Sequence, residues 1–517
     1  MLKKTLKKME VTRGFVQIPA QQKAELFGKE VTPFHTKLND SPARVDKYGR
    51  LWSEYLKNKF PVNTEVMIDK FGGEFQVTLH GQQECSPLEN GRSIEKLLPN
   101  SYDQANSVGT LILNGEGETK DVIFRDLVKL RSTTCATFGL YRYPAKFIPH
   151  VIAYILNQYA KPEMKVFDPF GGCGTVGVMS KLYGNDYELW DLNPMIETLH
   201  KIATMKPIEV DVAEVRKAML SSDRKFMPNW SRMQNWFPSD FMPFLHKVWG
   251  YYHSIQDSDL KLVLTVPLLK TTRYFSYDDP QKMKLTTSNR SKERVSRLLL
   301  TDWQRCFSQM FQNETLKVLK GIREYNQMAP KNVNAIVRGG VDSLKEELTE
   351  KKDILITSPP YVQSQEYIRQ AKIDLFWLGR SEEEVKALSK LEIPYRDIEP
   401  KPIYSETFME YEKTIKEEHI LKVFDNYFWG VIGALSRLQE NVSSYLFLFV
   451  GHSSTRGRAT PIDKILVEHF THLGWHHKAT LMDKIVSRRM FSYRVNPATG
   501  LKDARTLTEN LVILEKS

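Results

Sequence analysis

A glycine-rich turn between a predicted strand and a predicted helix constrains this chain more than any other feature. Residues 165–167 form a short apolar strand, which runs into the turn DPFGGCGT at residues 168–175. Residues 176–183 continue as a helix, and residues 187–190 form a second strand that ends on Asp191. Strand, turn, helix and strand make a βαβ unit, and such a unit implies a parallel sheet. The sequence therefore predicts an α/β fold.

The α/β pattern continues along much of the chain. Apolar residues at helical spacing predict helices at residues 149–158, 424–438 and 461–473. Short apolar runs predict strands at residues 353–357 and 444–450, followed by a closing pair near residues 478–483 and 509–515. This closing pair is compatible with a mostly parallel sheet that has an antiparallel strand at or near its edge.

Two regions depart from this pattern. Alternating residues predict strands at 74–81 and at 109–117, so we expect a small β-containing N-terminal region of unknown role at residues 1–120. Residues 205–335 carry charged helical stretches and few strand signals, which predicts a largely helical insertion. The α/β domain is therefore divided into residues 121–204 and 336–517.

The glycine turn predicts a site for a nucleoside-type ligand. Glycines permit positive φ angles and close approach of a ligand, and the amides of the following helix can receive an anion. Asp191 lies 23 residues after Asp168 at the end of the next strand, where a carboxylate can accept hydrogen bonds from ribose hydroxyls. The spacing does not fit GxGxxG and no Lys-Ser or Lys-Thr pair follows, which disfavours dinucleotides and nucleoside triphosphates. Without Asp191, the same glycines could mark only a tight turn.

The strand at residues 353–357 runs directly into Ser358-Pro359-Pro360-Tyr361. Two prolines stop the strand and remove two backbone donors, which leaves the Ser358 hydroxyl and nearby carbonyls as a rigid set of acceptors. Such acceptors suit an exocyclic base amine, because they bind its hydrogens and direct its lone pair toward an activated methyl group. Tyr361 can stack on a base taken out of the duplex. The alternative is a strand that prolines terminate for structural reasons only.

Four stretches together resemble the amino-methyltransferase family of DNA modification enzymes. YPAKFIP at residues 143–149 resembles the motif that covers the methionine end of the cofactor, and residues 168–175 resemble the FxGxG cofactor motif. DLNP at residues 191–194 resembles the ribose-binding motif. TSPPY at residues 357–361 resembles the catalytic motif in its cytosine-N4 form, whereas adenine-N6 enzymes usually carry Asp or Asn in place of Ser358. The order of the motifs is similar to the family's α-type arrangement, with the insertion between cofactor and catalytic motifs.

This resemblance implies a Rossmann-like, seven-strand class I methyltransferase sheet, with S-adenosyl-L-methionine as cofactor and target recognition within residues 205–335. It implies that Ser358, Pro359, Pro360 and Tyr361 are catalytic. It also implies contacts with the cofactor, and Asp342 and Ser343 would lie on the adenine side. The implied contacts are Tyr143, Ala145, Lys146, Phe147, Asp168, Pro169, Phe170, Gly172, Gly174, Thr175, Asp191, Leu192, Asn193, Asp342, Ser343 and Thr357.

We therefore expect a site-specific DNA methyltransferase that flips a cytosine out of double-stranded DNA and methylates its 4-amino group. The resemblance implies a restriction-modification or related defence system, with a cognate restriction endonuclease or another defence subunit as partner. One alternative is an adenine-N6 DNA methyltransferase, because base preference in this family is not strictly coded by position 358. Two further alternatives are an RNA amine methyltransferase and a non-catalytic DNA-binding regulatory subunit.

The net charge of +11 favours a polyanionic partner. Basic and aromatic side chains in the insertion suit phosphate contact and base stacking, and a second basic pair lies near the C-terminus. The residues expected to contact DNA are Arg273, Tyr274, Lys282, Lys284, Arg290, Lys292, Arg488 and Arg489. A solvated helix face is the alternative for the insertion, where acidic residues dilute the positive charge.

The four cysteines, Cys85, Cys135, Cys173 and Cys306, form no CxxC pair, so we expect neither a zinc site nor a disulfide framework. Such cysteines suit a reducing cytoplasm. The sequence contains no run of about 18 apolar residues, so we expect no membrane span. The basic start lacks the apolar segment of a secretory signal. We expect a cytoplasmic protein that requires no metal.

Overall fold

The structure, a computed structural model, separates the chain into two compact units, residues 1–99 and 100–517. They are described separately below. The residues that it describes are 2–5, 10, 15–18, 34–38, 41–46, 50–53, 65–71, 74–79, 108–109, 111–113, 115–143, 146–282, 284–362, 366–451, 453–455, 458–484 and 508–517.

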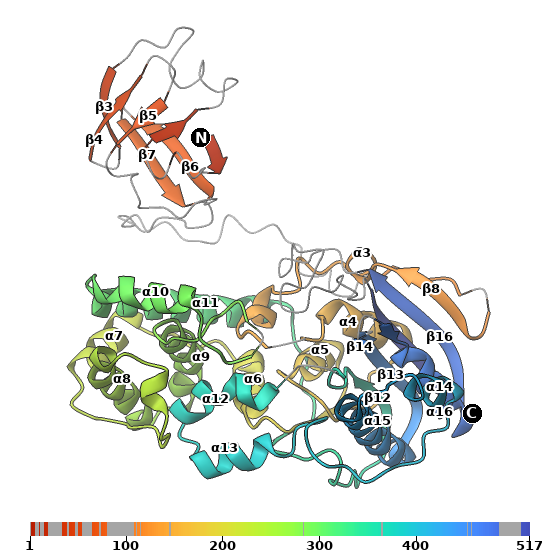
Figure 1. Cartoon of the computed structure of the whole chain (residues 1–517). Helices are drawn as coiled ribbons and strands as arrows, with labels where there is room; N and C mark the ends of the chain where they lie inside the picture. The colour runs from red at the N-terminus through yellow and green to blue at the C-terminus, as the bar shows by residue number, and fades with distance from the viewer. Residues whose placement is uncertain are drawn as a thin grey trace. The chain divides into compact units, whose positions relative to one another are not determined.

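The first unit contains a seven-stranded sheet (Figure 1). Its strands are β1 (Leu2–Thr5), β2 (Phe15–Gln17), β3 (Phe34–Leu38), β4 (Ser41–Val45), β5 (Arg50–Trp52), β6 (Glu65–Phe71) and β7 (Glu74–Leu79). Their order is β1-β6-β7-β3-β4-β5-β2, and every neighbouring pair is antiparallel except β3 and β7. Val16, Leu51 and Ile68 are fully buried, so this unit has an apolar core of its own.

The second unit is built on an eight-stranded sheet. Its strands are β8 (Glu118–Val122), β9 (Val166–Asp168), β10 (Tyr187–Asp191), β11 (Ala335–Gly339), β12 (Lys352–Thr357), β13 (Val442–Gly451), β16 (Trp475–Lys484) and β17 (Thr508–Lys516). Their order is β11-β10-β9-β12-β13-β17-β16-β8, and only β17 is antiparallel to its neighbours. A separate pair, β14 (Ser453–Thr455) and β15 (Arg458–Thr460), forms a small two-stranded sheet. Central strands such as β9 and β12 are apolar and almost wholly buried, as a parallel sheet with both faces covered requires.

Helices cover both faces of this sheet (Figure 1). The elements packed with one face are α3 (Phe124–Leu127), η4 (Ala136–Gly139), α4 (Pro149–Tyr159), α5 (Thr175–Tyr183) and α6 (Met195–Thr204). Those packed with the other face are α14 (Glu406–Glu412), α15 (Glu418–Leu438) and α16 (Ile462–His472), with η7 (Gln439–Asn441) following α15.

A helical region lies between β10 and β11 along the chain. It contains α7 (Val212–Ser221), η5 (Met233–Asn235), η6 (Ser239–Phe241), α8 (Met242–Ser254), α9 (Ser258–Tyr274), α10 (Asn289–Leu299) and α11 (Trp303–Gln327). Its apolar core also takes in α12 (Tyr367–Trp377) and α13 (Glu382–Ser389), which follow β12. Trp377 of α12 is fully buried and stacks on Trp249 of α8, with ring centroids 5.4 Å apart. The segment after the candidate catalytic strand is therefore packed into the helical region.

Most strands and helices predicted within the α/β domain are present, with ends within a few residues of the predicted ones, and the mostly parallel α/β sheet is confirmed. The strand predicted at residues 74–81 corresponds to β7, although residues 80 and 81 lie outside the described part of the chain. The prediction of seven strands for the large sheet is corrected to eight, because β8 adds a strand at its edge.

The strand predicted at residues 109–117 is wrong. The described residues of this range contain no strand residue, and β8 begins only at Glu118. Residues 115–117 form a turn instead, and the Gly117 amide donates a 3.0 Å hydrogen bond to the Lys478 carbonyl just before β8 pairs with β16. The true strand, ETKDV, is polar on its outer positions, so its sequence has little of the apolar character that marks a strand.

Candidate functional site

The glycine turn joins the end of β9 to the start of α5. Gly172 and Gly174 adopt φ angles of +58° and +81°, which residues with a side chain rarely adopt. A Cβ atom on Gly172 would also lie 3.1 Å from the ring of Tyr143, so the turn and this ring pack closely. Gly174 is the N-cap of α5 and no side chain caps the helix, which leaves the first amides of α5 available to a ligand.

Asp191 ties this turn to the next strand. Its Oδ2 accepts a 2.8 Å hydrogen bond from the Gly172 amide, and its Oδ1 accepts a 2.7 Å bond from the Asn193 amide. Burial raises the pKa of Asp191 to about 6, although the hydrogen bonds from Asn193 and Gly172 favour the charged form. The strand end, the turn and this carboxyl group form one rigid unit.

Asp168 ends β9 and is 2% exposed. Its Oδ1 accepts hydrogen bonds from the Thr357 hydroxyl, at 2.6 Å, and from the Phe170 amide, at 3.0 Å. Burial raises the pKa of Asp168 to about 7, and the hydrogen bonds from Thr357 and Phe170 oppose that rise. Because Thr357 is the last residue of β12, this contact joins the two strand ends that carry the predicted cofactor and catalytic motifs.

The segment that follows Thr357 meets the glycine turn at a shared cavity. Ser358 and Pro360 line this cavity, while Pro359 is buried beside them. Among the described residues, the Ser358 hydroxyl has no hydrogen-bond partner, so it is available to a molecule in the cavity. The segment therefore presents a free acceptor next to the turn.

Tyr361 does not line this cavity. Its hydroxyl donates a 2.5 Å hydrogen bond to Glu509 Oε1 at the start of β17, and its ring packs against Gly451 at the end of β13. A Cβ atom on Gly451 would lie 2.7 Å from the ring, so the absence of a side chain there makes room for Tyr361. Burial first, and then Glu509, raises the pKa of Tyr361 well above its usual value, so the ring stays neutral.

Asp342 and Ser343 form the wall that follows β11. Arg396 holds both carboxylate oxygens of Asp342 at 2.9 Å, and the Ser343 hydroxyl donates a 2.5 Å hydrogen bond to the Pro169 carbonyl. Arg437 in turn donates to the Ser343 carbonyl at 2.9 Å. This wall is thus fixed to the glycine turn and to two arginines of the second half of the domain.

The structure brings most of the predicted cofactor and catalytic residues into one cavity. The predicted residues that line it are Tyr143, Lys146, Phe147, Asp168, Phe170, Gly172, Thr175, Asp191, Leu192, Asn193, Asp342, Ser343, Ser358 and Pro360. The other predicted residues that the structure describes do not line it: Pro169, Gly174, Thr357, Pro359 and Tyr361. Ala145 lies outside the described residues.

The sequence reasoning missed other lining residues. They are Gly171, Cys173, Val176, Val341, Leu344, Tyr367, Ile368, Leu391, Glu392 and Ile393. Position next to a motif could have suggested several of them, and Tyr367 and Ile368 fall within the stretch that resembles the family. Residues 391–393 carry no motif, and only the folding of the chain brings them to the cavity.

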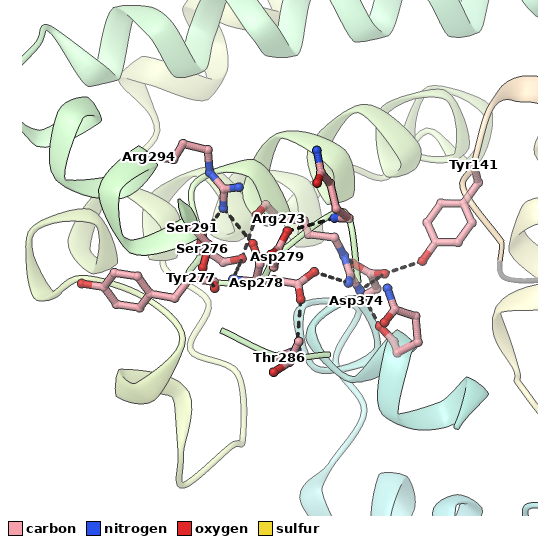
Figure 2. A network of polar contacts seen from close by, with 12 residues as sticks. Tyr141, Arg273, Ser276, Tyr277, Asp278, Asp279, Thr286, Ser291, Arg294 and Asp374 are labelled. Carbon is pink, nitrogen blue, oxygen red and sulfur yellow. Dashed lines mark hydrogen bonds and ion pairs between the residues drawn. The ribbon is translucent and has the colours of Figure 1, made fainter. Parts of the chain in front are cut away.

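Arg273, predicted to contact DNA, lies in an internal network (Figure 2). Its guanidinium donates to Asp278 at 2.9 Å, to Asp374 at 2.7 Å and to the Gln370 carbonyl at 2.7 Å. The hydroxyl of Tyr141 donates to the same Asp374. The network joins α9 to α12 and to the segment that precedes Tyr143, so Arg273 links the helical region to the walls of the cavity.

The other basic positions of the helical region have different surroundings. Lys282 and Lys292 are exposed, whereas Lys284 pairs with Glu366 at 3.0 Å and Arg290 pairs with Asp279. Tyr274 is 41% exposed, and the guanidinium of Arg294 lies over its ring, 5.2 Å from the centroid. Arg488 and Arg489 lie outside the described residues.

Two absences concern the described part of the chain alone. No three histidine, cysteine or acidic side chains there lie close enough together to hold a metal ion. In the same residues, no helix has the length and apolar character to span a membrane.

The strand order of the large sheet, with a glycine turn after β9 and a carboxylate at the end of β10, is compatible with a Rossmann-like methyltransferase domain. Sequence comparison agrees. The chain is 22% identical over 413 residues to the type II methyltransferase M.MvaI of Kocuria varians, which covers 72% of this chain and 90% of the relative. It is 21% identical over 358 residues to the type II methyltransferase M.BsoBI of Geobacillus stearothermophilus, which covers 64% of this chain and 68% of the relative.

These two relatives confirm the resemblance to the DNA methyltransferase family that the motifs predict. No family model matches the chain. No solved structure matches it either.

Proposed function

We propose that this protein is an S-adenosylmethionine-dependent DNA methyltransferase that modifies the 4-amino group of cytosine. One observation carries the proposal: the unpartnered Ser358 hydroxyl and Pro360 line the same cavity as Asp168, Gly172 and Asp191. The similarity to two type II methyltransferases supports the transfer of a methyl group to DNA within a restriction-modification system. A cytoplasmic setting and a cognate endonuclease as partner are part of the same proposal.

The cavity suits S-adenosylmethionine. The uncapped start of α5 offers amides to the methionine carboxylate, and Asp191 stands where it can accept from ribose hydroxyls. Apolar side chains such as Leu344 and Ile393, close to Asp342, provide a surface for an adenine ring. When bound, S-adenosylmethionine supplies a methyl group that its sulfonium already activates.

The protein's own contribution to the reaction is to hold and orient the amine. The Ser358 hydroxyl and the carbonyls beside Pro359 accept hydrogen bonds from the amine hydrogens, which turns the nitrogen lone pair toward the donor. With S-adenosylmethionine bound, a bond from nitrogen to the methyl carbon would replace the bond from sulfur to that carbon, and the surplus amine proton would leave to solvent. No side chain with a tuned pKa is required to remove that proton, because the nitrogen becomes strongly acidic once it carries the methyl group.

Tyr361 is proposed to present its ring to the extruded base. The hydrogen bond to Glu509 fixes the direction of the ring, and the raised pKa keeps the hydroxyl protonated. A fixed aromatic ring costs little ordering entropy when a base stacks on it. Serine rather than Asp or Asn at position 358 favours cytosine over adenine.

Contacts with DNA are assigned to the helical region between β10 and β11. The exposed Lys282 and Lys292 are free to approach phosphates, and Tyr274 is 41% exposed, whereas Arg273 is committed to internal partners. Lys284 and Arg290 would have to exchange their acidic partners for phosphate. Phosphate contacts of this kind position the duplex, while base contacts in the same region would specify the recognised site.

The test is incubation of the purified chain with methyl-labelled S-adenosylmethionine and either duplex DNA or RNA, followed by digestion to nucleosides and mass spectrometry. The proposal expects N4-methylcytosine from DNA and no product from RNA. N6-methyladenine as the sole product would support the adenine alternative, and methylated RNA would support the RNA alternative. DNA binding without transfer to either polymer would support a regulatory subunit.

A further inference from the structure

Glu392 is a buried acidic side chain of the cavity that no motif includes. It lies in the segment between α13 and α14, is 5% exposed and contributes to the cavity lining. A buried carboxyl group costs folding energy unless it is neutral or compensated. Its presence in the lining therefore calls for a physical reason.

Two backbone amides at the start of α12 hold this carboxyl group. The Ile368 amide donates a 2.8 Å hydrogen bond to Glu392 Oε1, and the Tyr367 amide also donates to the carboxyl group. The N-cap residue of α12, Glu366, makes no capping hydrogen bond of its own. Glu392 thus caps α12, but a carboxylate has about four acceptor positions, and the two amides use only about half of them.

The charges around Glu392 do not neutralise it. Burial raises its pKa to about 7; the two amides and Lys372 favour the charged form, and the negative charge of Glu366 opposes it. In the described part of the chain, neither Glu392, Asp168 nor Asp191 forms an ion pair. Together they make a cavity whose lining is rich in unpaired carboxyl groups, and such a lining attracts a cation.

Lys146, a basic residue of the lining, does little to balance the charge of these carboxyl groups. The Lys146 ammonium donates to the Phe138 carbonyl, which draws part of its hydrogen-bonding capacity away from the cavity. Arg396, close by, is held by both oxygens of Asp342. A positively charged ligand therefore gains more from this cavity than a neutral one of the same shape.

We propose that Glu392 is a specificity-determining residue that makes the cavity prefer the cationic methyl donor to its neutral demethylated product. This inference rests on the proposed function. S-adenosylmethionine carries a methylated sulfonium where S-adenosylhomocysteine has a neutral thioether, while both share the same nucleoside and the same zwitterionic amino-acid end. A carboxylate within a cavity of low dielectric constant distinguishes them by charge alone and so favours release of the product.

The test compares the affinities of S-adenosylmethionine, S-adenosylhomocysteine and sinefungin, which carries an ammonium in place of the sulfonium, by isothermal titration calorimetry at pH 8. Glu392→Gln keeps an oxygen that accepts from the amides of α12 and removes the charge. We expect it to weaken binding of the two cationic ligands about tenfold and to leave binding of S-adenosylhomocysteine within about twofold. Equal weakening of all three ligands, or no change in any, would overturn the proposal and leave Glu392 as a helix cap only.

The matched control is Glu366→Gln. Glu366 lies near Glu392 and pairs with Lys284 and Arg369, but it does not line the cavity. We expect this variant to leave the preference for cationic ligands unchanged, and an equal loss there would overturn the assignment to Glu392. A wild-type chain that binds none of the three ligands would instead refute the proposed function.

The pH dependence of the same preference offers a second measurement. Glu392 attracts a cation only when it is ionised, and the groups that set its charge are Glu366, Lys372 and the amides of Tyr367 and Ile368. The preference for S-adenosylmethionine over S-adenosylhomocysteine should therefore rise between about pH 5.5 and pH 8. The rise should be smaller in Glu392→Gln, in which only Asp168 and Asp191, with pKa values of about 7 and about 6, still ionise in the lining over that range. A preference that is the same at both pH values would overturn the proposal.

Discussion

The hydroxyl of Thr357 donates a 2.6 Å hydrogen bond to Oδ1 of Asp168, across 189 residues of sequence. Both residues end strands that are neighbours in the parallel sheet, and both are almost fully buried. The bond fixes the start of the Ser358 segment relative to the glycine turn. Positioning of this kind matters for methyl transfer, since small displacements of the reacting groups reduce the rate strongly.

Thr357→Val removes this hydrogen bond and keeps the shape of the side chain. We expect the free energy of unfolding to fall by about 1–3 kcal/mol, because Asp168 loses one of its two hydrogen-bond donors in a buried place. Urea denaturation measures the change. Thr357→Ser is the control, since it keeps the hydroxyl, and a loss in Thr357→Val no larger than that in Thr357→Ser would mean that this hydrogen bond does not stabilise the fold.

The ionisation of Asp168 makes a prediction about pH. Its pKa is about 7 in the folded chain and near 3.8 in an unfolded one, so the folded state holds this proton more tightly. The stability that protonated Asp168 contributes is therefore fully present below about pH 4 and is lost as the pH rises through 7. Asp168→Asn stays neutral and still accepts hydrogen bonds. The free energy of unfolding of this variant, compared with that of the wild type, should therefore be higher at pH 8 than at pH 5. Denaturation at both pH values checks this, and an equal difference at the two would contradict it.

The network around Arg273 makes a prediction about stability (Figure 2). Asp374→Ala leaves a buried guanidinium with one carboxylate in place of two and also removes the partner of Tyr141. We expect a loss of about 3–5 kcal/mol in the free energy of unfolding.

The control for that variant is an exposed ion pair of the same helical region. Glu293 and Arg297 are 65% and 77% exposed in their side chains, and Glu293→Ala should cost no more than about 1 kcal/mol. Chemical denaturation of both variants gives the comparison. Losses that agree within 1 kcal/mol would mean that the buried network does not hold the helical region to α12.

Two variants of Tyr361 separate the role of its ring from the role of its hydroxyl. Tyr361→Phe removes only the hydrogen bond to Glu509, and we expect the rate of methyl transfer to fall by about tenfold. Tyr361→Ala also removes the stacking surface, and we expect a loss of about a hundredfold or more. Neither change should alter the affinity for S-adenosylmethionine by more than about threefold, because the ring does not line the cavity. Equal losses in rate would argue against a stacking role.

Local signals allowed much of the fold to be predicted. The apolar strands β9 and β12 and the glycine turn lie where the sequence predicts them. β8 was missed because Val122 is its only apolar residue and the other four positions are polar. β11 was missed as well, and its five residues are exposed or only partly buried.

The candidate site, too, could be predicted from local sequence only in part. Asp191 and Ser358 could be assigned because each follows a recognisable strand. Glu392 belongs to no motif, and a hydrogen bond from the Ile368 amide of α12 holds its carboxyl group. Arg273 is the opposite case: its sequence neighbours are basic and aromatic, but its partner Asp374 is 101 residues away. Pairing over such distances is a property of the tertiary structure, which short patterns do not encode.

The central claim is that one cavity holds both the methyl donor and the residues that orient the amine. Ser358→Ala tests it most directly, through S-adenosylmethionine affinity and single-turnover methylation of duplex DNA measured on the same preparation. The account predicts affinity within about threefold of the wild type and a loss of transfer of about a hundredfold or more, since an orienting group is removed from the transition state. Transfer at the wild-type rate, or loss of cofactor binding with the fold intact, would contradict it.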